Sequence, residues 1–342
     1  MKAAVLRGVG DLRLEDLPDP HPAANEVLIR VKAAGLCGTD LHMWQGTNQE
    51  GTFPFIPGHE WSGQVVATGK EVKGVVVGDR VVAEVPIPCH KCANCQDGME
   101  PNMCPDFELY GFSWENPGGM AEYTLAREER LFKIPDNVSY EEAALVEPVS
   151  VAYHGVWGSG GGAAPHDRVV VFGAGPIGLF AMLSCKASGA PVIVVEPQAA
   201  RREMALDLGA DVALDPTGGD LVEQVMDHTG GRGATMVLEC SGSNGALAAT
   251  LDVIAKQGRI VLIGQSAGRK IPIEIGKAIF ERTTIVGSSG SPYFFPKTLT
   301  FMSRQLVDLM PVVTHQFPLS ETLDAFELGK SGTGCAKILV LP

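Results

Sequence analysis

Three glycines lie between an apolar stretch at residues 168–172 and a helical pattern at residues 179–188, and this feature most limits the fold. Gly173, Gly175 and Gly178 have the spacing G-x-G-x-x-G. The first allows a tight turn, the second lets the backbone approach a pyrophosphate, and the third permits close helix–strand packing. Amide groups at the start of the following helix would face the phosphates. This context predicts a dinucleotide-binding loop.

The sequence after residue 168 alternates between apolar strand patterns and helical patterns. Further strands are expected at residues 191–196, 234–242, 258–264 and 283–290. Such alternation predicts an α/β domain with a doubly wound parallel sheet. The first 150 or so residues differ, because short β-rich runs are closely punctuated by Gly and Pro, which predicts an irregular β-rich domain. Residues 158–162 (GSGGG) are expected to form a flexible turn or linker between them.

The choice of dinucleotide depends on residues beyond the glycine loop. Glu196 ends the next strand, 18 residues after Gly178. A carboxylate there can accept hydrogen bonds from ribose hydroxyls and would repel a 2′-phosphate. Arg201 and Arg202 keep NADP open, because arginine near this place can pair with a 2′-phosphate. We give Glu196 more weight and expect NAD.

Charge and hydropathy exclude several classes of function. The chain has 27 Lys+Arg against 40 Asp+Glu, a net charge of -13, and no basic cluster. Nucleic acid is therefore not an expected partner. We find neither the apolar core of a signal peptide nor a membrane-spanning run, so a cytoplasmic protein without a membrane partner is expected.

Four of the eight cysteines fall in one short segment. Cys89, Cys92, Cys95 and Cys104 have the spacing C-x2-C-x2-C-x8-C. Four thiolates at such spacing can close a tetrahedron around zinc, and a site with four protein ligands has no open position. The segment therefore predicts a structural zinc.

A second set of metal donors is spread along the chain. Cys37 supplies a sulfur, His59 an imidazole, and Glu60 and Glu147 carboxylates. Together they can provide three protein ligands and leave the open position that a catalytic zinc needs to polarise an alcohol. Asp40, three residues after Cys37, is expected to hold the imidazole of His59 in place.

These motifs together resemble the zinc-containing medium-chain dehydrogenase/reductase superfamily over essentially the whole chain. The resemblance rests on CGTDLH, PGHEWSG, VGDRV, GGMAEY, EPVSVAYH, GAGPIG and the cysteine segment. It implies a GroES-like catalytic domain in residues 1–152, with a zinc lobe at about 86–108. A Rossmann domain in residues 153–290 and a return segment in residues 291–342 would follow.

The resemblance implies that Cys37 and His59 bind the catalytic zinc. The third ligand of ordinary alcohol dehydrogenases is a cysteine, which this chain lacks in the matching region. Glu147 stands instead in a segment similar to the sorbitol/polyol and threonine dehydrogenase branches, where Glu60 can also exchange in. The third ligand stays open between these two. In the lobe, eight residues separate Cys95 and Cys104 where the family usually has seven, so a one-residue bulge is expected.

The resemblance also implies a proton path and further cofactor contacts. Thr39 would take the proton of the alcohol and pass it through the nicotinamide ribose to His42 and solvent. Besides the glycine loop and Glu196, the implied cofactor-binding residues are Ile177, Arg201, Ile263 and Ser288.

The implied function is zinc-dependent oxidation of a polyol, cyclitol or sugar derivative to a ketone, with hydride transfer to NAD. Two zincs per chain are expected, one catalytic and one structural, and the subunits are expected to form a dimer or tetramer. The residues 192–211 are similar to threonine dehydrogenases, so L-threonine 3-dehydrogenase is the alternative. A non-catalytic nucleotide-binding relative is the third hypothesis.

Overall fold

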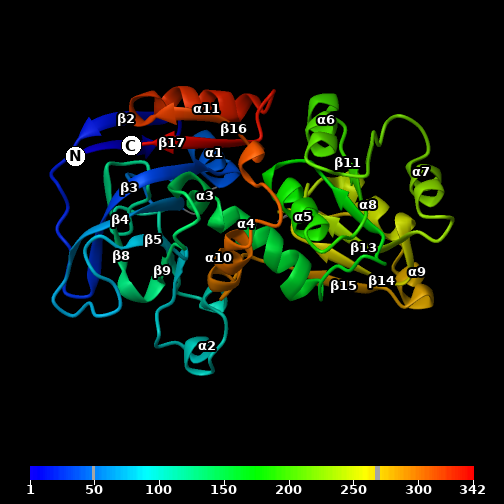
Figure 1. Ribbon diagram of the computed structural model, residues 1–342, viewed down its shortest axis with the longest axis horizontal. Helices are drawn as coiled ribbons and strands as arrows, with labels where there is room; N and C mark the ends of the chain where they lie inside the picture. Colours follow the sequence, from blue (N-terminus) through cyan, green and yellow to red (C-terminus); the bar gives the residue numbers. More distant parts are fainter. Residues whose placement is uncertain (48–50, 266–269) are drawn as a thin grey trace. The chain divides into compact units, whose positions relative to one another are not determined.

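The structure is a computed structural model that describes residues 1–47, 51–265 and 270–342. It divides into two compact units (Figure 1). Unit 1 contains Met1–Glu147, Phe295–Gln305 and Val313–Pro342, and unit 2 contains Pro148–Phe294 and Leu306–Val312. The chain therefore leaves unit 1 and later returns to it.

Unit 2 is built around a six-stranded sheet in which each strand is followed by a helix up to the last strand. The strands are β10 (Val169–Phe172), β11 (Val192–Val195), β12 (Val212–Leu214), β13 (Ala234–Glu239), β14 (Ile254–Leu262) and β15 (Thr284–Gly287). The helices are α5 (Pro176–Lys186), α6 (Ala199–Asp207), α7 (Leu221–His228), α8 (Asn244–Val253) and α9 (Ile275–Glu281). All neighbouring strands are parallel.

The strand order is β12-β11-β10-β13-β14-β15, which confirms the doubly wound parallel sheet expected from the sequence. Every residue of β10 and β11 is buried, as expected for central parallel strands covered on both faces. The order reverses between β10 and β13, so the loops after these two strands flank the place where such sheets bind ligands.

One local expectation in unit 2 is wrong. The stretch 158–162 was expected to be a turn or linker, but its first two residues belong to a π-helical turn, His154–Ser159. This turn continues helix α4 (Val146–Tyr153) without a break. Gly160 follows with its N–H bonded to the carbonyl of Gly155, so helical hydrogen bonding extends into the glycine run.

Unit 1 is mainly β-structure, as expected. Its strands are β1 (Lys2–Gly8), β2 (Asp11–Asp16), β3 (Glu26–Leu36), β4 (Glu60–Thr68), β5 (Arg80–Ala83), β6 (Pro86–Ile87), β7 (Glu108–Leu109), β8 (Tyr123–Arg127), β9 (Leu131–Lys133), β16 (Val313–Pro318) and β17 (Lys337–Leu341). The largest sheet has the order β16-β17-β3-β4-β5-β9, with β8 also paired to β3. β1 pairs with β2, and β6 pairs with β7.

Short helices connect these strands. They are α1 (Gly38–Gln45), α2 (Ala93–Gln96), α3 (Tyr140–Ala144), α10 (Phe295–Ser303) and α11 (Thr322–Ser331), while α4 begins in unit 1 and continues into unit 2. Single 3-10 turns occur at Pro101–Met103, Glu128–Arg130 and Leu319–Glu321 in unit 1, and at Met310–Val312 in unit 2. Only one helix, near residues 296–309, and a final strand were expected after residue 290, so the sequence did not reveal β16 and α11.

The sheet of unit 1 brings distant segments to one end of β3. Gly35 is paired with Glu60 of β4, and Leu36 with Ile338 of β17, both in antiparallel register. The end of β3 leads directly into Cys37 and helix α1. Two segments from the first part of the chain and one from its last strand therefore meet where the candidate donors lie.

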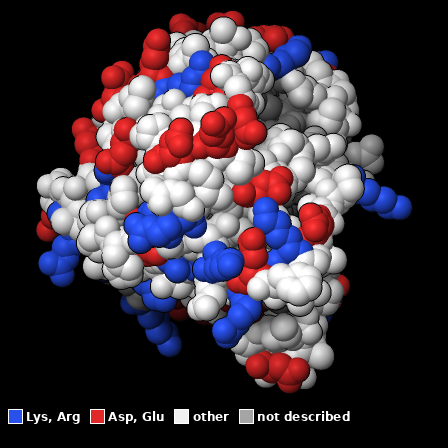
Figure 2. Space-filling view, turned by 90° about the vertical axis from the view of Figure 1, so that its right-hand side faces the viewer, with Lys and Arg blue, Asp and Glu red and all other residues white. Residues whose placement is uncertain are grey.

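No helix within the described ranges is both long and apolar enough to cross a lipid bilayer. On the face shown in Figure 2, acidic side chains lie among the basic ones, so the described residues there form no uninterrupted basic surface.

Candidate metal centres and cofactor loop

Three of the predicted metal donors meet in unit 1. One donor atom each of Cys37, His59 and Glu60 lies within 4.8 Å of the others. His59 and Glu60 are buried, and Cys37 is half-buried. A thiolate, an imidazole and a carboxylate are donors that zinc accepts, so this set fits a catalytic zinc with three protein ligands.

Cys37 lies at the start of helix α1. Cys37 is the N-cap residue of α1, so its side chain lies at the positive end of an eight-residue helix.

Asp40 connects the two segments that carry Cys37 and His59. Its buried carboxylate accepts the N–H of Cys37 at 3.0 Å and the N–H of Gly58 at 3.2 Å. Asp40 Oδ1 also lies 3.7 Å from Nδ1 of His59, which makes no hydrogen bond to any described residue. Asp40 therefore fixes both backbone segments and faces the imidazole.

The electrostatics of this cluster favour a bound cation. Burial disfavours the charged form of His59, but Cys37 and Asp40 outweigh it and raise the pKa of His59 well above its usual value. Cys37 and Asp40 thus favour positive charge beside the buried imidazole of His59, where water is largely excluded. A divalent metal ion bound there would supply that positive charge.

Glu147 lies in the first turn of helix α4. It is not a member of the close group of Cys37, His59 and Glu60. Burial raises the pKa of Glu147 to about 7, with His59 opposing this shift and Glu60 adding to it. The charges of His59 and Glu60 therefore act on the carboxyl group of Glu147. Of the two candidate third ligands, Glu60 belongs to the close group and Glu147 does not.

Sequence reasoning missed Lys337, which makes an ion pair of 2.6 Å with Glu60. Its side chain is 3% exposed. The signal in the sequence was a lysine at the start of an apolar strand, KILVL, since buried lysines are rare without a partner.

The two expected proton-relay residues lie on helix α1. The Thr39 hydroxyl is 3.6 Å from the sulfur of Cys37. His42 is exposed and follows Thr39 by three residues, so both lie on one face of the helix.

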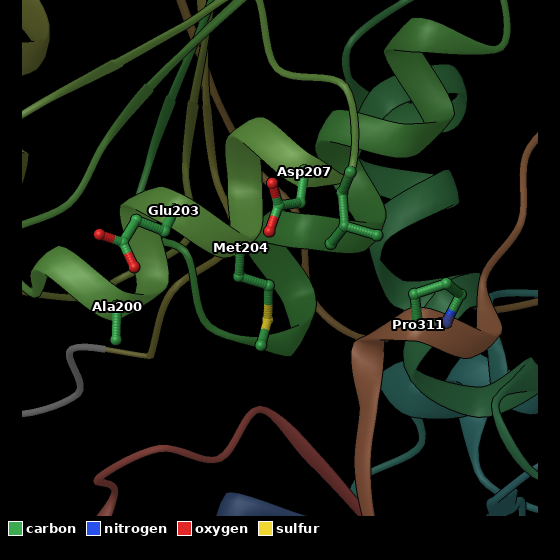
Figure 3. Close-up of a pocket in the computed structure, with 6 residues that line it drawn as sticks. Ala200, Glu203, Met204, Asp207 and Pro311 are labelled. Atoms are coloured by element: carbon green, nitrogen blue, oxygen red, sulfur yellow. The ribbon is translucent and has the colours of Figure 1, made fainter.

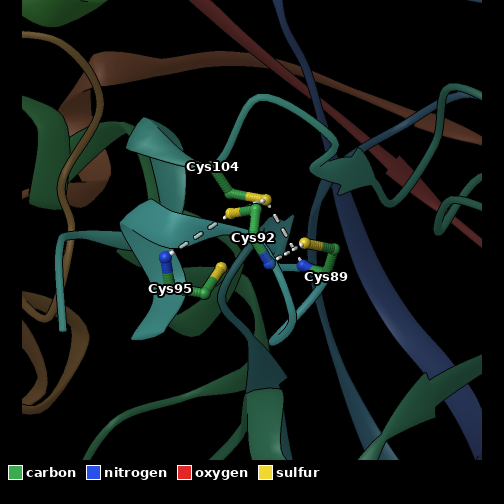
Figure 4. A group of neighbouring side chains, drawn as sticks. All are labelled: Cys89, Cys92, Cys95 and Cys104. Atoms are coloured by element: carbon green, nitrogen blue, oxygen red, sulfur yellow. Dashed lines mark hydrogen bonds between the residues drawn. The ribbon is translucent and has the colours of Figure 1, made fainter. Parts of the chain in front are cut away.

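The four clustered cysteines form a second group, with all four sulfurs within 4.8 Å of one another. Their side chains point toward one another (Figure 4). The sulfurs of Cys92 and Cys104 are 3.8 Å apart, close to the separation of about 3.8 Å that bonds of ~2.3 Å in a zinc tetrahedron require. The set therefore fits a four-sulfur zinc.

Backbone N–H groups in this lobe are placed to stabilise negatively charged sulfur atoms. The N–H groups of Cys89, Cys92 and Cys95 point at sulfurs of the group at 3.4–3.5 Å. Backbone hydrogen bonds lower the pKa of Cys89 to about 6, whereas burial raises that of Cys95 to about 12. The 3-10 turn Pro101–Met103 takes up part of the eight-residue interval before Cys104.

The glycine loop of unit 2 joins β10 to α5. Gly173 has φ +93°, and Gly175 is the N-cap residue of α5. A Cβ on Gly178 would lie 1.9 Å from the carbonyl oxygen of Gly173, whereas a Cβ on Gly175 would meet nothing within 4 Å. Gly178 is therefore required by packing, while Gly175 leaves open space in front of the helix N-terminus.

Glu196 directly follows β11 and touches this loop. Its carboxylate accepts the N–H of Ala174 at 2.8 Å and that of Gln198 at 2.9 Å. Arg202 donates to the carbonyls of Glu196 and Pro197 and pairs with Asp215 at 3.0 Å. The guanidinium of Arg202 is thus already engaged, which leaves it less suited to hold a 2′-phosphate.

The remaining expected cofactor residues also lie in unit 2. Ile177 belongs to the first turn of α5, and Arg201 to that of α6. Ile263 and Ser288 directly follow the neighbouring strands β14 and β15. His154 of the π-helical turn lies 3.3 Å from the Ser288 hydroxyl and 3.0 Å from the carbonyl of Gly290.

A hollow of about 380 Å³ lies beside helix α6 and contains none of the expected site residues. Its lining includes Glu203, Met204, Asp207 and Pro311, which Figure 3 labels. Two carboxylates would repel a phosphate group, so this hollow does not suit a dinucleotide phosphate.

The chain was compared with known families and proteins. Residues 23–136 match the alcohol dehydrogenase GroES-like domain, and residues 176–304 match the zinc-binding dehydrogenase family. The chain is 33% identical to the sorbitol dehydrogenase of Bacillus subtilis, over 100% of this chain and 97% of that protein. It is 34% identical to the D-arabitol-phosphate dehydrogenase of Enterococcus avium, over 94% and 91%.

Solved structures agree in fold. A putative zinc-binding dehydrogenase from Sinorhizobium meliloti bound to NADP superposes with a TM-score of 0.93 at 30% identity, over 100% of this chain and 99% of that one. An alcohol dehydrogenase from Escherichia coli complexed with NADH superposes with a TM-score of 0.91 at 28% identity, also over 100% and 99%. The two neighbours hold different nicotinamide dinucleotides.

We predict that Gly178→Ala lowers the free energy of unfolding by about 1–3 kcal/mol, because the new methyl group collides with a backbone carbonyl. Thermal unfolding of the cofactor-free protein measures this. Gly175→Ala is the matched control and should unfold at the same temperature or slightly higher, since its φ of -73° suits alanine. Equal unfolding temperatures of the two variants would contradict the packing role of Gly178.

We predict that Cys95→Ser removes one zinc per chain and lowers the unfolding temperature, because binding of a structural metal is coupled to folding. Elemental analysis and thermal unfolding measure the two effects. Met103→Ala, in the same lobe and 41% exposed, should change neither. A Cys95→Ser variant with full zinc content and an unchanged unfolding temperature would contradict the structural zinc site.

Proposed function

The chain belongs to the zinc-containing medium-chain dehydrogenase/reductase superfamily and is an enzyme that acts on CH–OH donors, and we propose that it oxidises a secondary alcohol of a polyol or sugar derivative to a ketone with NAD. The observation that carries this proposal is the meeting of Cys37, His59 and Glu60 beside the Thr39 hydroxyl. The sorbitol and arabitol-phosphate dehydrogenases among its relatives support the polyol class.

Two metal sites are part of the proposal. Cys37 and His59 would hold a catalytic zinc, with Glu60 or Glu147 as the third ligand, and the four-cysteine lobe would hold a structural zinc. A zinc ion between Cys37 and His59 would polarise the alcohol oxygen, and NAD would accept the hydride from carbon. Asp40 would keep the imidazole of His59 in the orientation that binding requires.

The alcohol loses a hydride and a proton, and we propose that residues of helix α1 accept the proton. Thr39, with its hydroxyl close to the Cys37 sulfur, would accept the proton as the carbonyl forms. His42, one helical turn further along α1 and exposed, would receive the proton from this relay and release it to solvent.

The dinucleotide would bind at the glycine loop of unit 2. Free amide groups at the N-terminus of α5 would hold the pyrophosphate, with room in front of Gly175. The Glu196 carboxylate still has lone pairs for ribose hydroxyls after accepting two N–H groups. The engagement of Arg202 and the negative charge of Glu196 favour NAD over NADP.

Unit 2 also has a surface suited to a second copy of the chain, which supports the expected dimer or tetramer. β15 forms one edge of the sheet, and its residues include no proline or charge that would block pairing. Helix α9 beside it exposes Ile279 and Phe280 at 72% and 90%. A strand edge can pair with itself about a two-fold axis. The molar mass in solution tests this.

The central prediction is that the zinc-loaded protein reduces NAD with polyols such as sorbitol or xylitol, followed through the absorbance of the reduced nicotinamide. Cyclitols and L-threonine belong in the same screen, because turnover of L-threonine alone would replace the polyol assignment. Glu147→Gln should lower kcat/KM by about 10–100-fold, because the carboxylate lies near the metal ligands.

The matched control for that variant is Glu141→Gln on the adjacent helix α3, which should keep wild-type activity. The unfolding temperature of both variants should stay near the wild-type value, since neither change touches the four-cysteine lobe or the core of unit 2, and zinc content shows whether each variant keeps its metal. If Glu147→Gln keeps full activity, Glu147 is not part of the catalytic site, and Glu60 is the remaining candidate for the third ligand.

We further predict that Glu196→Ala lowers the ratio of kcat/KM for NAD to that for NADP by about tenfold, the equivalent of ~1.4 kcal/mol. The ratio is the right measure, because loss of two backbone hydrogen bonds also lowers stability, and the ratio does not depend on the folded fraction. Glu203→Ala removes an exposed carboxylate from α6 and should leave the ratio unchanged. A wild-type preference for NADP would contradict the role of Glu196.

A further inference from the structure

Two side chains of helix α4 and the π-helical turn that continues it hold the loop after β15, residues 288–291. Ser150 and His154 are four residues apart, so they lie on one side of the helix. The Ser150 hydroxyl donates to the hydroxyl of Ser291 at 2.6 Å, and Nδ1 of His154 lies 3.0 Å from the carbonyl oxygen of Gly290. The loop is therefore fastened at two consecutive residues, all within unit 2.

The imidazole of His154 is held in one orientation. A carbonyl oxygen only accepts hydrogen bonds, so the contact with Gly290 requires a hydrogen on Nδ1. The Ser288 hydroxyl lies 3.3 Å from the same nitrogen, and it can only accept from it, which leaves the hydroxyl hydrogen for another partner. The ring also packs edge-on against Phe294, with 4.7 Å between the ring centroids. A Cβ on Gly158 would lie 2.2 Å from Cδ2 of His154, so Gly158 leaves the ring its space.

The same turn makes room for the residue that follows β14. A Cβ on Gly155 would lie 2.4 Å from Cδ1 of Ile263, so any side chain at position 155 would displace Ile263. Ile263 and Ser288 directly follow β14 and β15, and both are expected to contact the cofactor. Isolated π-helical turns frequently occur at functional sites. Here the turn fixes the positions of two expected cofactor residues at once.

Strands β14 and β15 belong to the nicotinamide half of the proposed cofactor site. A dinucleotide binds across the carboxyl ends of the strands where the strand order reverses, which is between β10 and β13. Glu196, after β11, is assigned to the adenosine ribose. The other half of the dinucleotide then lies on the side of β13, β14 and β15.

We infer that the π-helical turn, through His154 and Gly155, positions the residues after β14 and β15 for the nicotinamide and so sets the affinity for that half of the dinucleotide alone. The carboxamide of nicotinamide has an acceptor oxygen and two N–H donors, and the hydroxyl hydrogen of Ser288 and the backbone groups of the loop can meet them. A loop that is fastened beforehand loses less conformational freedom when the ligand binds. This inference rests on the proposed cofactor site at the glycine loop.

The experiment measures the binding of two ligands by calorimetric titration of the zinc-loaded protein without substrate. The ligands are NADH and ADP-ribose, which lacks the nicotinamide. His154→Leu keeps a side chain of similar bulk and removes the donor, so the Kd for NADH should rise about tenfold, the effect of one lost hydrogen bond. The Kd for ADP-ribose should stay within about twofold of the wild-type value, because the adenosine half binds away from the loop.

His154→Asn tests rescue, because its amide N–H2 can lie near the place of Nδ1, and it should recover most of the affinity for NADH. His228→Leu changes an exposed histidine of α7 in the same unit and should alter neither Kd. General damage to unit 2 would weaken both ligands together, so the ratio of the two Kd values distinguishes positioning from a merely structural role. An unchanged ratio in His154→Leu, or an Asn variant no better than the Leu variant, would overturn the inference.

Gly155→Ala decides the matter if His154→Leu does not fold. Its methyl group displaces Ile263, so NADH should bind more weakly and ADP-ribose as before, and an unchanged ratio would overturn the inference. A wild-type protein that binds neither ligand would refute the proposed cofactor site itself. A wild-type protein that binds both, with the same ratio in the variants, would refute only the role of the π-helical turn.

Discussion

A single buried carboxylate fixes the geometry on which the candidate metal centre depends. Asp40 accepts backbone N–H groups from the segment of Cys37 and from the segment of His59, although these segments are more than twenty residues apart. Buried backbone N–H groups need partners, and here one side chain satisfies two of them. Cys37, His59 and Glu60 come together because Asp40 holds the loop before β4 against the start of α1.

Much of unit 2 could be predicted because its signals are local. The apolar runs of β10 and β11, the spacing of Gly173, Gly175 and Gly178, and the helix that follows are neighbours in the sequence. The doubly wound sheet predicted from them is confirmed. The cysteine lobe was equally easy to find, because its four sulfurs come from sixteen consecutive residues, 89–104. The metal and cofactor roles of these residues remain predictions.

The parts that sequence reasoning missed depend on contacts between distant segments. The ion pair of Lys337 and Glu60 joins residues 277 positions apart, and no periodicity in either strand indicates it. β16 was missed because none of its residues is fully buried, and α11 because only Thr322, Ala325 and Phe326 face the core. The start of the stretch 158–162 was mistaken for a linker, since Gly158 and the glycines that follow it resemble those of a flexible turn. Glu196 was placed correctly after its strand, yet its bonds to the glycine loop could not be read from spacing.

The distance along the chain between Glu60 and Lys337 has a consequence for biosynthesis. During translation, Cys37, His59 and Glu60 leave the ribosome long before β17 is made. Until β17 is made, the ammonium group that pairs with Glu60 in the folded protein does not exist. The buried ion pair can therefore form only late, when β17 pairs with β3. The charge of a carboxylate placed early in the sequence is thus balanced only by the last strand of the chain.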